Sequence, residues 1–434
     1  MCTFTHTCTY GVNHLLSVLR NRTYRHLFTA QVVALLGTGL LTVALGLLAF
    51  DLAGANSGAV LGTALTIKMI AYVGVAPVIN ALVAKLPPKP VLIGADVVRA
   101  AMALCLPFIT EVWQIYAVVF LLQAASATFT PAFQSVIPAV LPAERDYTNA
   151  LSLSRLAYDL EALVSPAAAA VALTLFSYHE LFIGTAVGFV VSALMVAATV
   201  LPRSRTAAGA EGSIWHRTTL GVRIFFATLR LRSLLALNLA VAAPTALVLV
   251  NTVVYVREVM GRPETDLAIA LGAYGIGSMA VALAIPRLLE RFETRTVMLA
   301  GAGVIPLAMV AASLLSFRVG TTSGWMTLLV LWVVLGAANS TILTPSARVL
   351  RDASDEHNRP YVFTAQFSLS HACFIITYPV AGWVGAQAGL GWAATTLTLI
   401  ATMGAAAAFI SWPRSVISAE VSAVGDDGTR EHRP

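Results

Sequence analysis

Apolar residues occur along this chain in twelve long stretches that are separated by short polar segments. A helix that crosses the hydrocarbon core of a bilayer needs about 20 predominantly apolar residues. The pattern therefore predicts an all-α membrane protein with twelve transmembrane helices. The predicted spans are residues 27–50, 59–84, 91–109, 114–138, 149–176, 181–201, 234–256, 267–287, 296–316, 324–345, 362–386 and 391–412.

Short motifs recur in the same order in the two halves of the chain. The sequence SLSR at 152–155 returns as SLSH at 368–371, 216 residues later, and the Thr-Pro pair at 130–131 returns at 344–345, 214 residues later. A near-constant offset of half the chain predicts two six-helix repeats, an arrangement found in many secondary transporters. The predicted parts are a leader (1–26), a first bundle (27–201), a middle loop (202–232), a second bundle (233–412) and a tail (413–434).

Composition and charge set the environment. The chain is 58% hydrophobic and 11% charged, whereas soluble domains carry about 25% charged residues. Of its 27 Lys and Arg residues, 21 fall on the side of the predicted spans that holds the termini, and three fall in the opposite loops. Cytoplasmic loops are enriched in Lys and Arg. This predicts a multi-pass protein of the bacterial inner (plasma) membrane with both termini in the cytoplasm.

The net charge of +6 then indicates that the basic residues lie near anionic lipid headgroups. It does not indicate binding of nucleic acid. The middle loop holds either an amphipathic helix near residues 220–231 or an unstructured linker.

The six-plus-six arrangement, with cytoplasmic termini and a basic middle loop, resembles the major facilitator superfamily. Residues 93–100 (IGADVVRA) and 130–134 (TPAFQ) resemble its efflux-type branch. The family's glycine–aspartate–arginine signature corresponds to residues 80–90, where Asn80 and Ala84 replace the glycine and the aspartate. Span five keeps Pro166 of the antiporter signature, but its glycines are Ser and Ala. Bacterial drug, siderophore and nickel-resistance exporters resemble the chain about equally well.

The resemblance implies a secondary active exporter of a small molecule, driven by a proton gradient through alternating access. No bound cofactor is expected, and the protein is expected to act as a monomer. An exporter of a divalent, nickel-like metal ion is one alternative, and a non-transporting receptor or assembly partner is another. The chain lacks the G-x-x-x-x-G-K-[ST] phosphate loop, so neither direct use of ATP nor an enzyme is predicted.

Ionisable residues within membrane spans are the first candidates for transport, because placing a charge there is unfavourable. Lys68, Asp159, Glu161 and His371 each lie about ten residues from a span end, which is about 15 Å deep at 1.5 Å per residue. We expect Glu161 and His371 to carry coupling or substrate binding, with Lys68 beside them. Asp159 lies four residues after Arg155, so these two can form a pair on one helix face.

Other polar residues have weaker claims. Asp96 and Arg99, with the loop lysines Lys85 and Lys89, are gating candidates. The uncharged candidates for lining a cavity, each of which can alternatively bond helix to helix, are Gln31, Gln123, Asn238, Asn251 and Asn339. By the resemblance, spans one, four, seven and ten line this cavity. Cys2, His6, Cys8 and His14 carry metal-binding atoms, but their spacing matches no standard site.

The orientation can be tested by labelling. Cysteines introduced at Asn56 and Thr322 should react with an impermeant thiol reagent added outside intact cells. A cysteine at Ser204 should react only after the membrane is opened. External labelling at Ser204 would contradict the charge argument.

Overall fold

The computed structural model describes residues 17–75, 86–201, 214–317, 322–354 and 358–413, and almost all of them are helical. In the first half, α2 and α3 are followed by four further long helices. Their bounds are α2 Arg22–Ala53, α3 Ser57–Ile70, α5 Pro88–Cys105, α6 Val112–Val140, α7 Glu144–Ala172 and α8 Tyr178–Ala197. Each of these helices overlaps one of the first six predicted spans, and residues 76–84 of the second span lie outside the described residues.

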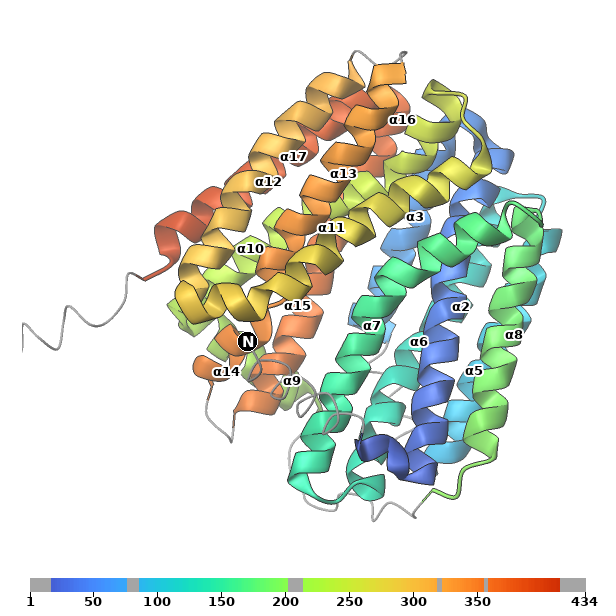
Figure 1. The fold of residues 1–434 in the computed structure, drawn as a ribbon, viewed down its shortest axis with the longest axis vertical. Helices are drawn as coiled ribbons and strands as arrows, with labels where there is room; N and C mark the ends of the chain where they lie inside the picture. Colours follow the sequence, from blue (N-terminus) through green and yellow to red (C-terminus); the bar gives the residue numbers. More distant parts are fainter. Residues whose placement is uncertain (1–16, 76–85, 202–213, 318–321, 355–357, 414–434) are drawn as a thin grey trace, which may run out of the picture.

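The second half repeats this order after a short amphipathic helix, α9 (Ile214–Ala227), which packs on α15. The long helices are α10 Leu229–Ala246, α11 Glu264–Arg291, α12 Thr294–Ser316, α13 Thr322–Leu343, α15 Arg359–Pro379 and α17 Leu390–Ser411. The short α14 (Ser346–Asp352) and α16 (Gly385–Ala388) lie between them. Figure 1 shows α2 and α5–α8 grouped on one side and α10–α17 on the other. The prediction of two six-helix repeats is confirmed.

Local sequence explains several helix ends. Asn21 caps α2, because its side-chain oxygen accepts a hydrogen bond from the backbone N–H of Tyr24. Pro88 and Pro90 occupy the first turn of α5, where a missing N–H is tolerated. Glu111 and Gln114 form a capping box at the start of α6. Gly389, with a φ of 93°, allows the sharp turn between α16 and α17.

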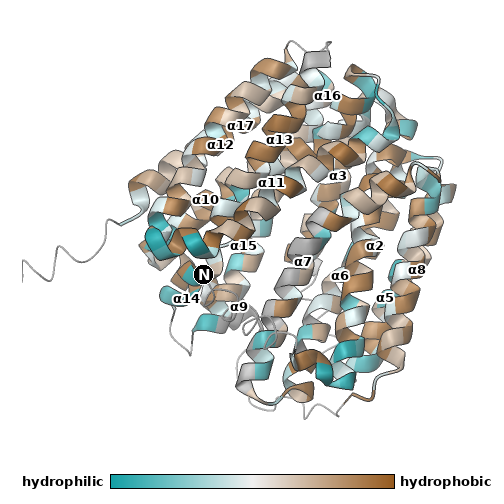
Figure 2. Ribbon diagram, in the orientation of Figure 1, coloured by the Kyte–Doolittle hydropathy of each residue, from teal (hydrophilic) through white to brown (hydrophobic). Residues whose placement is uncertain are grey.

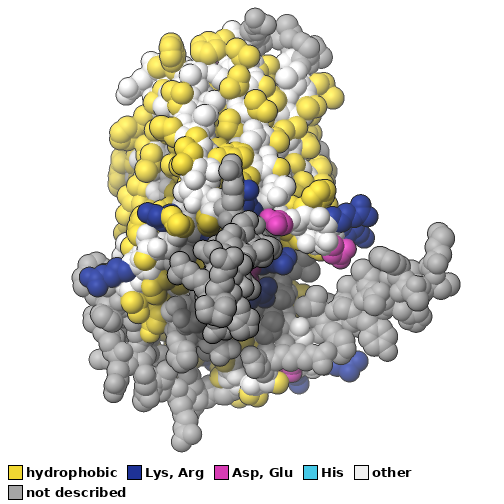
Figure 3. Space-filling view, turned by 90° about the vertical axis from the view of Figure 1, so that its left-hand side faces the viewer, with side chains coloured by type: hydrophobic (Ala, Val, Ile, Leu, Met, Phe, Trp, Pro, Cys, Tyr) yellow, Lys and Arg dark blue, Asp and Glu magenta, His cyan; other side chains and the backbone are white. Residues whose placement is uncertain are grey.

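Ten stretches of the described residues are long and apolar enough to cross a membrane, and one of them covers α2 and α3 together. Helix α7 is the remaining long helix, and it carries charged residues near its centre. Figure 2 shows apolar residues along the middle of the helices and hydrophilic ones at many of their ends. In Figure 3, apolar side chains cover the upper part of the visible face, and Lys and Arg side chains lie below this apolar region. This surface suits a protein whose sides are solvated by lipid.

The two halves meet along α7 with α11 and along α3 with α15. At the second seam, π-helical turns interrupt both partners: η3 (Ala71–Val75) follows α3, and η7 (Val380–Val384) follows α15. A Cβ added to Gly62 would lie 2.7 Å from the carbonyl oxygen of Tyr378, and one added to Gly382 would lie 2.5 Å from that of Gly58. The two backbones therefore touch without intervening side chains, as small residues permit in membrane helices.

This contact predicts the effect of a larger residue. Gly382→Leu should separate α3 from η7 and lower the thermal midpoint of the purified protein in detergent, since overpacking costs about 1–3 kcal/mol. The control is Gly303→Leu, because a Cβ there would meet no atom closer than 4.0 Å. Equal midpoints for the two variants would show that the seam tolerates a side chain.

Candidate functional site

A cavity of about 380 Å³ lies between the halves, and helices of both contribute to it. Most of its wall comes from α2, α3, η3, α5, α6 and α7. The second half contributes Leu249, from the π-helical η5 (Leu247–Asn251), and Leu271 and Tyr274 of α11. The charged side chains on the described part of the wall are Lys68, Arg99 and Glu161. The wall thus mixes apolar residues with polar and charged ones, a combination that can bind a small molecule.

Glu161 and Lys68 face this cavity from α7 and α3, and their charges interact. The ammonium of Lys68 also lies 5.8 Å from the centre of the Tyr72 ring. Tyr72 follows Lys68 by four residues, so both occupy the same side of one helix. Lys68 and Glu161, which were expected at a similar depth, line the same cavity. Opposite charges at this depth lower the cost of keeping each ionised away from water.

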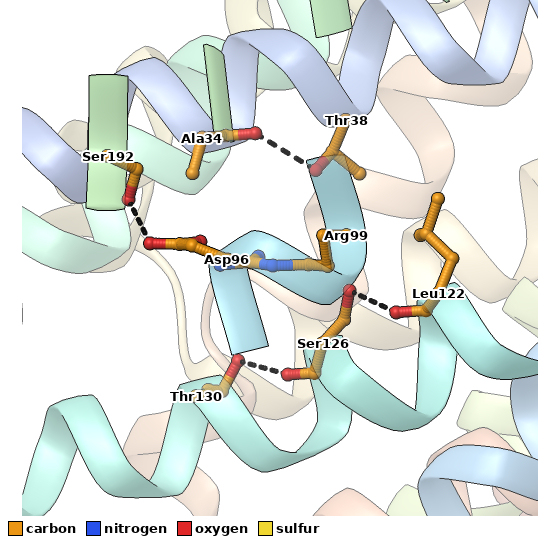
Figure 4. Close-up of polar contacts among 8 residues, drawn as sticks. All are labelled: Ala34, Thr38, Asp96, Arg99, Leu122, Ser126, Thr130 and Ser192. Atoms are coloured by element: carbon orange, nitrogen blue, oxygen red, sulfur yellow. Dashed lines mark hydrogen bonds and ion pairs between the residues drawn. The ribbon is translucent and has the colours of Figure 1, made fainter. Parts of the chain in front are cut away.

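Arg99 is held on the wall by three neighbours. Its guanidinium pairs with Asp96, and Ser192 of α8 donates a hydrogen bond of 2.7 Å to the same carboxylate (Figure 4). The guanidinium also lies 4.2 Å and 4.6 Å from the ring centres of Phe129 and Phe189. Both members of the ion pair are buried. The expected association of Asp96 with Arg99 is present, and it places a fixed cation beside the cavity.

Lys89, the other described gating candidate, lies apart from this pair. Its ammonium donates hydrogen bonds of 2.7 Å to the carbonyl oxygens of Ala197 and Thr199 at the end of α8. Lysine at a helix C-terminus satisfies carbonyls that have no partner within the helix. This geometry supports a structural contact. Lys85 lies outside the described residues.

His371 lies on α15, opposite η3 of the other half. Its imidazole is 5.6 Å from the Tyr72 ring and 4.2 Å from the Phe367 ring, measured between centres. Its Nδ1 is 2.7 Å from the carbonyl oxygen of Phe367. His371 is not among the described cavity-lining residues, but Tyr72 connects it to that wall. Tyr72 therefore contacts His371 and belongs to the same cavity wall as Glu161.

The uncharged candidates divide into two groups. Gln31 lines the cavity and accepts a hydrogen bond of 3.0 Å from Ser154. Gln123 lines a neighbouring space of about 20 Å³ beside Lys68. The three asparagines instead bond within the second half. Asn238 donates to Gln366 at 3.1 Å, Asn251 to the Ala381 carbonyl at 3.0 Å, and Asn339 to the Tyr274 hydroxyl at 2.6 Å.

The asparagines therefore follow the helix-to-helix alternative, and none of them is among the described residues of the cavity wall. Helix α13, which corresponds to span ten, likewise supplies no described lining residue, in contrast to the expectation that spans one, four, seven and ten line the cavity. Asn339 reaches the wall only through Tyr274. The reason is rotation about the helix axis, which decides whether a polar residue faces the seam or a neighbour within its own half.

Some candidates cannot be placed. Cys2, His6, Cys8 and His14 lie outside the described residues, as do the side chains of Arg155 and Asp159. In the part of the chain that is described, no group of three His, Cys, Asp or Glu side chains could hold a metal ion. The thiol of Cys373 is buried and donates a hydrogen bond of 3.4 Å to the Leu369 carbonyl.

Several cavity residues were not anticipated from the sequence. They are Thr38 and Gly39 of α2, Tyr72 of η3, Ser126, Phe129 and Thr130 of α6, Ser165 of α7 and Tyr274 of α11. Spacing offered a partial signal, since Tyr72 and Ser165 lie four residues after Lys68 and Glu161 and so share their helix faces.

Comparison with known proteins agrees with this geometry. Residues 27–318 and 234–427 match the sequence pattern of the Major Facilitator Superfamily. Macrolide efflux protein A of Streptococcus pyogenes is 26% identical over 182 residues, which is 41% of this chain and 44% of that protein. The protein of the same name from Enterococcus faecalis is 26% identical over 153 residues, which is 33% of this chain and 47% of that protein. The matched part thus spans less than half of each relative, and these matches support the resemblance to the efflux-type branch.

Solved structures show the same fold at low sequence identity. The nucleoside transporter NupG superposes with a TM-score of 0.67 and 18% identity, covering 90% of this chain and 98% of that one. A bacterial homologue of the human lysosomal transporter Spinster, in an inward-facing and unoccupied conformation, gives 0.68 at 13% identity, covering 90% and 96%. On its sequence, its two six-helix repeats and the cavity between them, this chain belongs to the Major Facilitator Superfamily and is a multi-pass secondary transporter, not an enzyme.

Proposed function

We propose that this transporter is a proton-coupled exporter of amphiphilic small molecules in a bacterial plasma membrane, with both termini in the cytoplasm. The observation that carries the proposal is the pair of opposite charges, Glu161 and Lys68, on the wall of the cavity between the halves. A coupling group must gain and lose a proton as the halves rock, and a carboxylate beside a cation can change partner when it does so.

The substrate class follows from the cavity and from the relatives. About 380 Å³ lies within the range of about 300–1,000 Å³ of small-molecule sites. Its wall combines apolar residues such as Phe129, Leu249 and Leu271 with the three charges. Such a wall suits a compound with an apolar body and a few polar groups. Because the curated relatives are macrolide efflux proteins, macrolides are the first compounds to test.

A divalent metal ion is the alternative substrate. Metal transport requires several oxygen, nitrogen or sulfur ligands around one point. Of the ligands it would use, Glu161 lines the cavity, while His371 contacts Tyr72 beside it. The amphiphile proposal is the better supported one, because the described wall holds a single carboxylate and no histidine or cysteine.

The substrate can be tested by growth. A bacterial strain that lacks its own exporters, with and without this protein, should be compared on macrolides, other amphiphilic drugs and nickel, cobalt and zinc salts. We expect expression to raise the tolerated concentration of amphiphiles and to leave metal tolerance unchanged. Increased tolerance of metals alone would favour the metal alternative, and no change in any compound would count against export.

The coupling residues can be tested by substitution. Glu161→Gln and His371→Asn keep the approximate size of each side chain and remove its acid–base chemistry. Either change should reduce pH-driven export of erythromycin to the level of cells without the protein, measured as accumulation at two external pH values. The exposed Glu290 at the end of α11 provides the matched control, and Glu290→Gln should export normally.

Membrane content of each variant must be measured in parallel. Lys68→Met leaves Glu161 without its cation, and so it should reduce both protein yield and export. If Glu161→Gln and His371→Asn retain the full pH dependence at normal yield, these residues are structural and the coupling assignment is wrong.

A further inference from the structure

Helix α2 packs very closely against α7 at Gly39. A Cβ added at this position would lie 2.0 Å from Cβ and 2.1 Å from Oγ of Ser165, and 2.7 Å from Oε1 of Glu161. Real Cβ atoms essentially never come within 3.0 Å of another heavy atom. One oxygen of the Glu161 carboxylate therefore lies against a patch of bare backbone that any other residue would cover.

The backbone conformation does not require glycine here. Gly39 is inside α2, and the glycines with positive φ in the described chain are Gly54, Gly261 and Gly389. In a helix interior, glycine is less favourable than alanine by about 1 kcal/mol. Alanine at this position would thus strengthen the helix itself. The need for glycine comes from the space that Ser165 and Glu161 occupy.

Ser165 shows how close this packing is. It lies one turn after Glu161 on the same face of α7, and only 1% of its surface is exposed. Its hydroxyl has no hydrogen-bond partner among the residues that the structure describes. The nearest atoms to a Cβ at Gly39 are the Cβ and the Oγ of Ser165, so the two residues meet by direct packing. Gly39, Ser165 and Glu161 all line the cavity.

The other charged or titratable groups on the described cavity wall are Lys68 of α3, Tyr72 of η3, Arg99 of α5 and Tyr274 of α11. The imidazole of His371 on α15 contacts the Tyr72 ring. The position of the Glu161 carboxylate relative to Lys68 determines how strongly the carboxylate is held in its ionised form, because charge interactions depend on distance.

We propose that Gly39 is a positioning residue for Glu161: its lack of a side chain lets α2 approach α7 and places the carboxylate on the cavity wall opposite Lys68. This inference rests on the proposed coupling role of Glu161. It assigns to α2 a part in setting the pH at which Glu161 exchanges its proton. Gly39 does not itself contact the proton or the substrate by a side chain.

Two substitutions separate positioning from packing. Gly39→Ala creates contacts with both Ser165 and Glu161. Adding Ser165→Gly removes the Cβ and the Oγ of Ser165, so that among the three nearest contacts only the carboxylate of Glu161 remains in the way. Gly46→Ala on the same helix is the matched control, because a Cβ there would meet nothing closer than the Leu267 side chain at 3.6 Å. Ser165→Gly alone is the control for the double variant.

The readout is the protonation of Glu161 itself. Infrared spectra of the purified full-length protein in detergent, recorded across pH, show the carbonyl band of protonated carboxyl groups. The contribution of Glu161 is the part that Glu161→Gln removes. We expect the titration midpoint of Glu161 in the double variant to differ from that of Ser165→Gly by about one pH unit, since moving a carboxylate relative to a nearby charge has effects of this size. Ser165→Gly gives the effect of losing Ser165 alone, and Gly46→Ala should titrate as the wild type.

The outcomes are distinct. A double variant that folds and titrates at the midpoint of Ser165→Gly would show that Gly39 serves only helix packing, and the inference would be overturned. If Gly39→Ala alone cannot be purified, the double variant still decides the question. Normal pH-driven export by Glu161→Gln would remove the proposed coupling role, whereas the infrared midpoint would still report whether Gly39 positions the carboxylate.

Discussion

Direct backbone contact between α3 and η7 is the interaction on which the rest of this structure depends. Gly58 and Gly62 on one side and Gly382 on the other bring the two halves together with no side chain between them. Trp383 adds a hydrogen bond of 3.0 Å to Thr63 across the same seam. Because the halves are held together here and along α7 and α11, a cavity can remain between them beside these contacts. The same principle recurs within the first half, where Gly39 brings α2 against α7.

Charged side chains within the membrane-spanning helices are stabilised by groups of opposite charge and by neighbouring polar and aromatic side chains. Asp96 and Arg99 form a buried pair in which Ser192 and two phenylalanine rings complete the surroundings. Glu161 and Lys68 come from different helices, and both are open to the cavity. A pair within one helix holds its geometry when the helices move. A pair between helices is better suited to a change of partner, and for this reason the proposed mechanism uses Glu161 and Lys68 instead of Asp96 and Arg99.

Helix spacing predicted part of the candidate site. The shared depth of Lys68 and Glu161 was available from their distances to the span ends, and Asp96 and Arg99 were grouped together as gating candidates. The asparagines show the limit of this reasoning. Asn339 has the depth of a cavity residue, yet it donates its hydrogen bonds to Tyr274 and to α10. The depth of a residue in the membrane follows from counting residues along its helix. The direction in which its side chain points depends on how all the helices pack.

The sequence by itself determined the twelve helices, their division into two repeats and the family. These properties depend on local features: the length of apolar stretches, the placement of Lys and Arg, and motifs that recur at a constant offset. Only the tertiary structure decided which polar groups meet. It placed Gly39 against Glu161, Tyr72 between Lys68 and His371, and Tyr274 on the cavity wall. Such contacts join residues that are far apart in the chain, and the direction in which each helix faces is set by packing against its neighbours, which no single helix encodes.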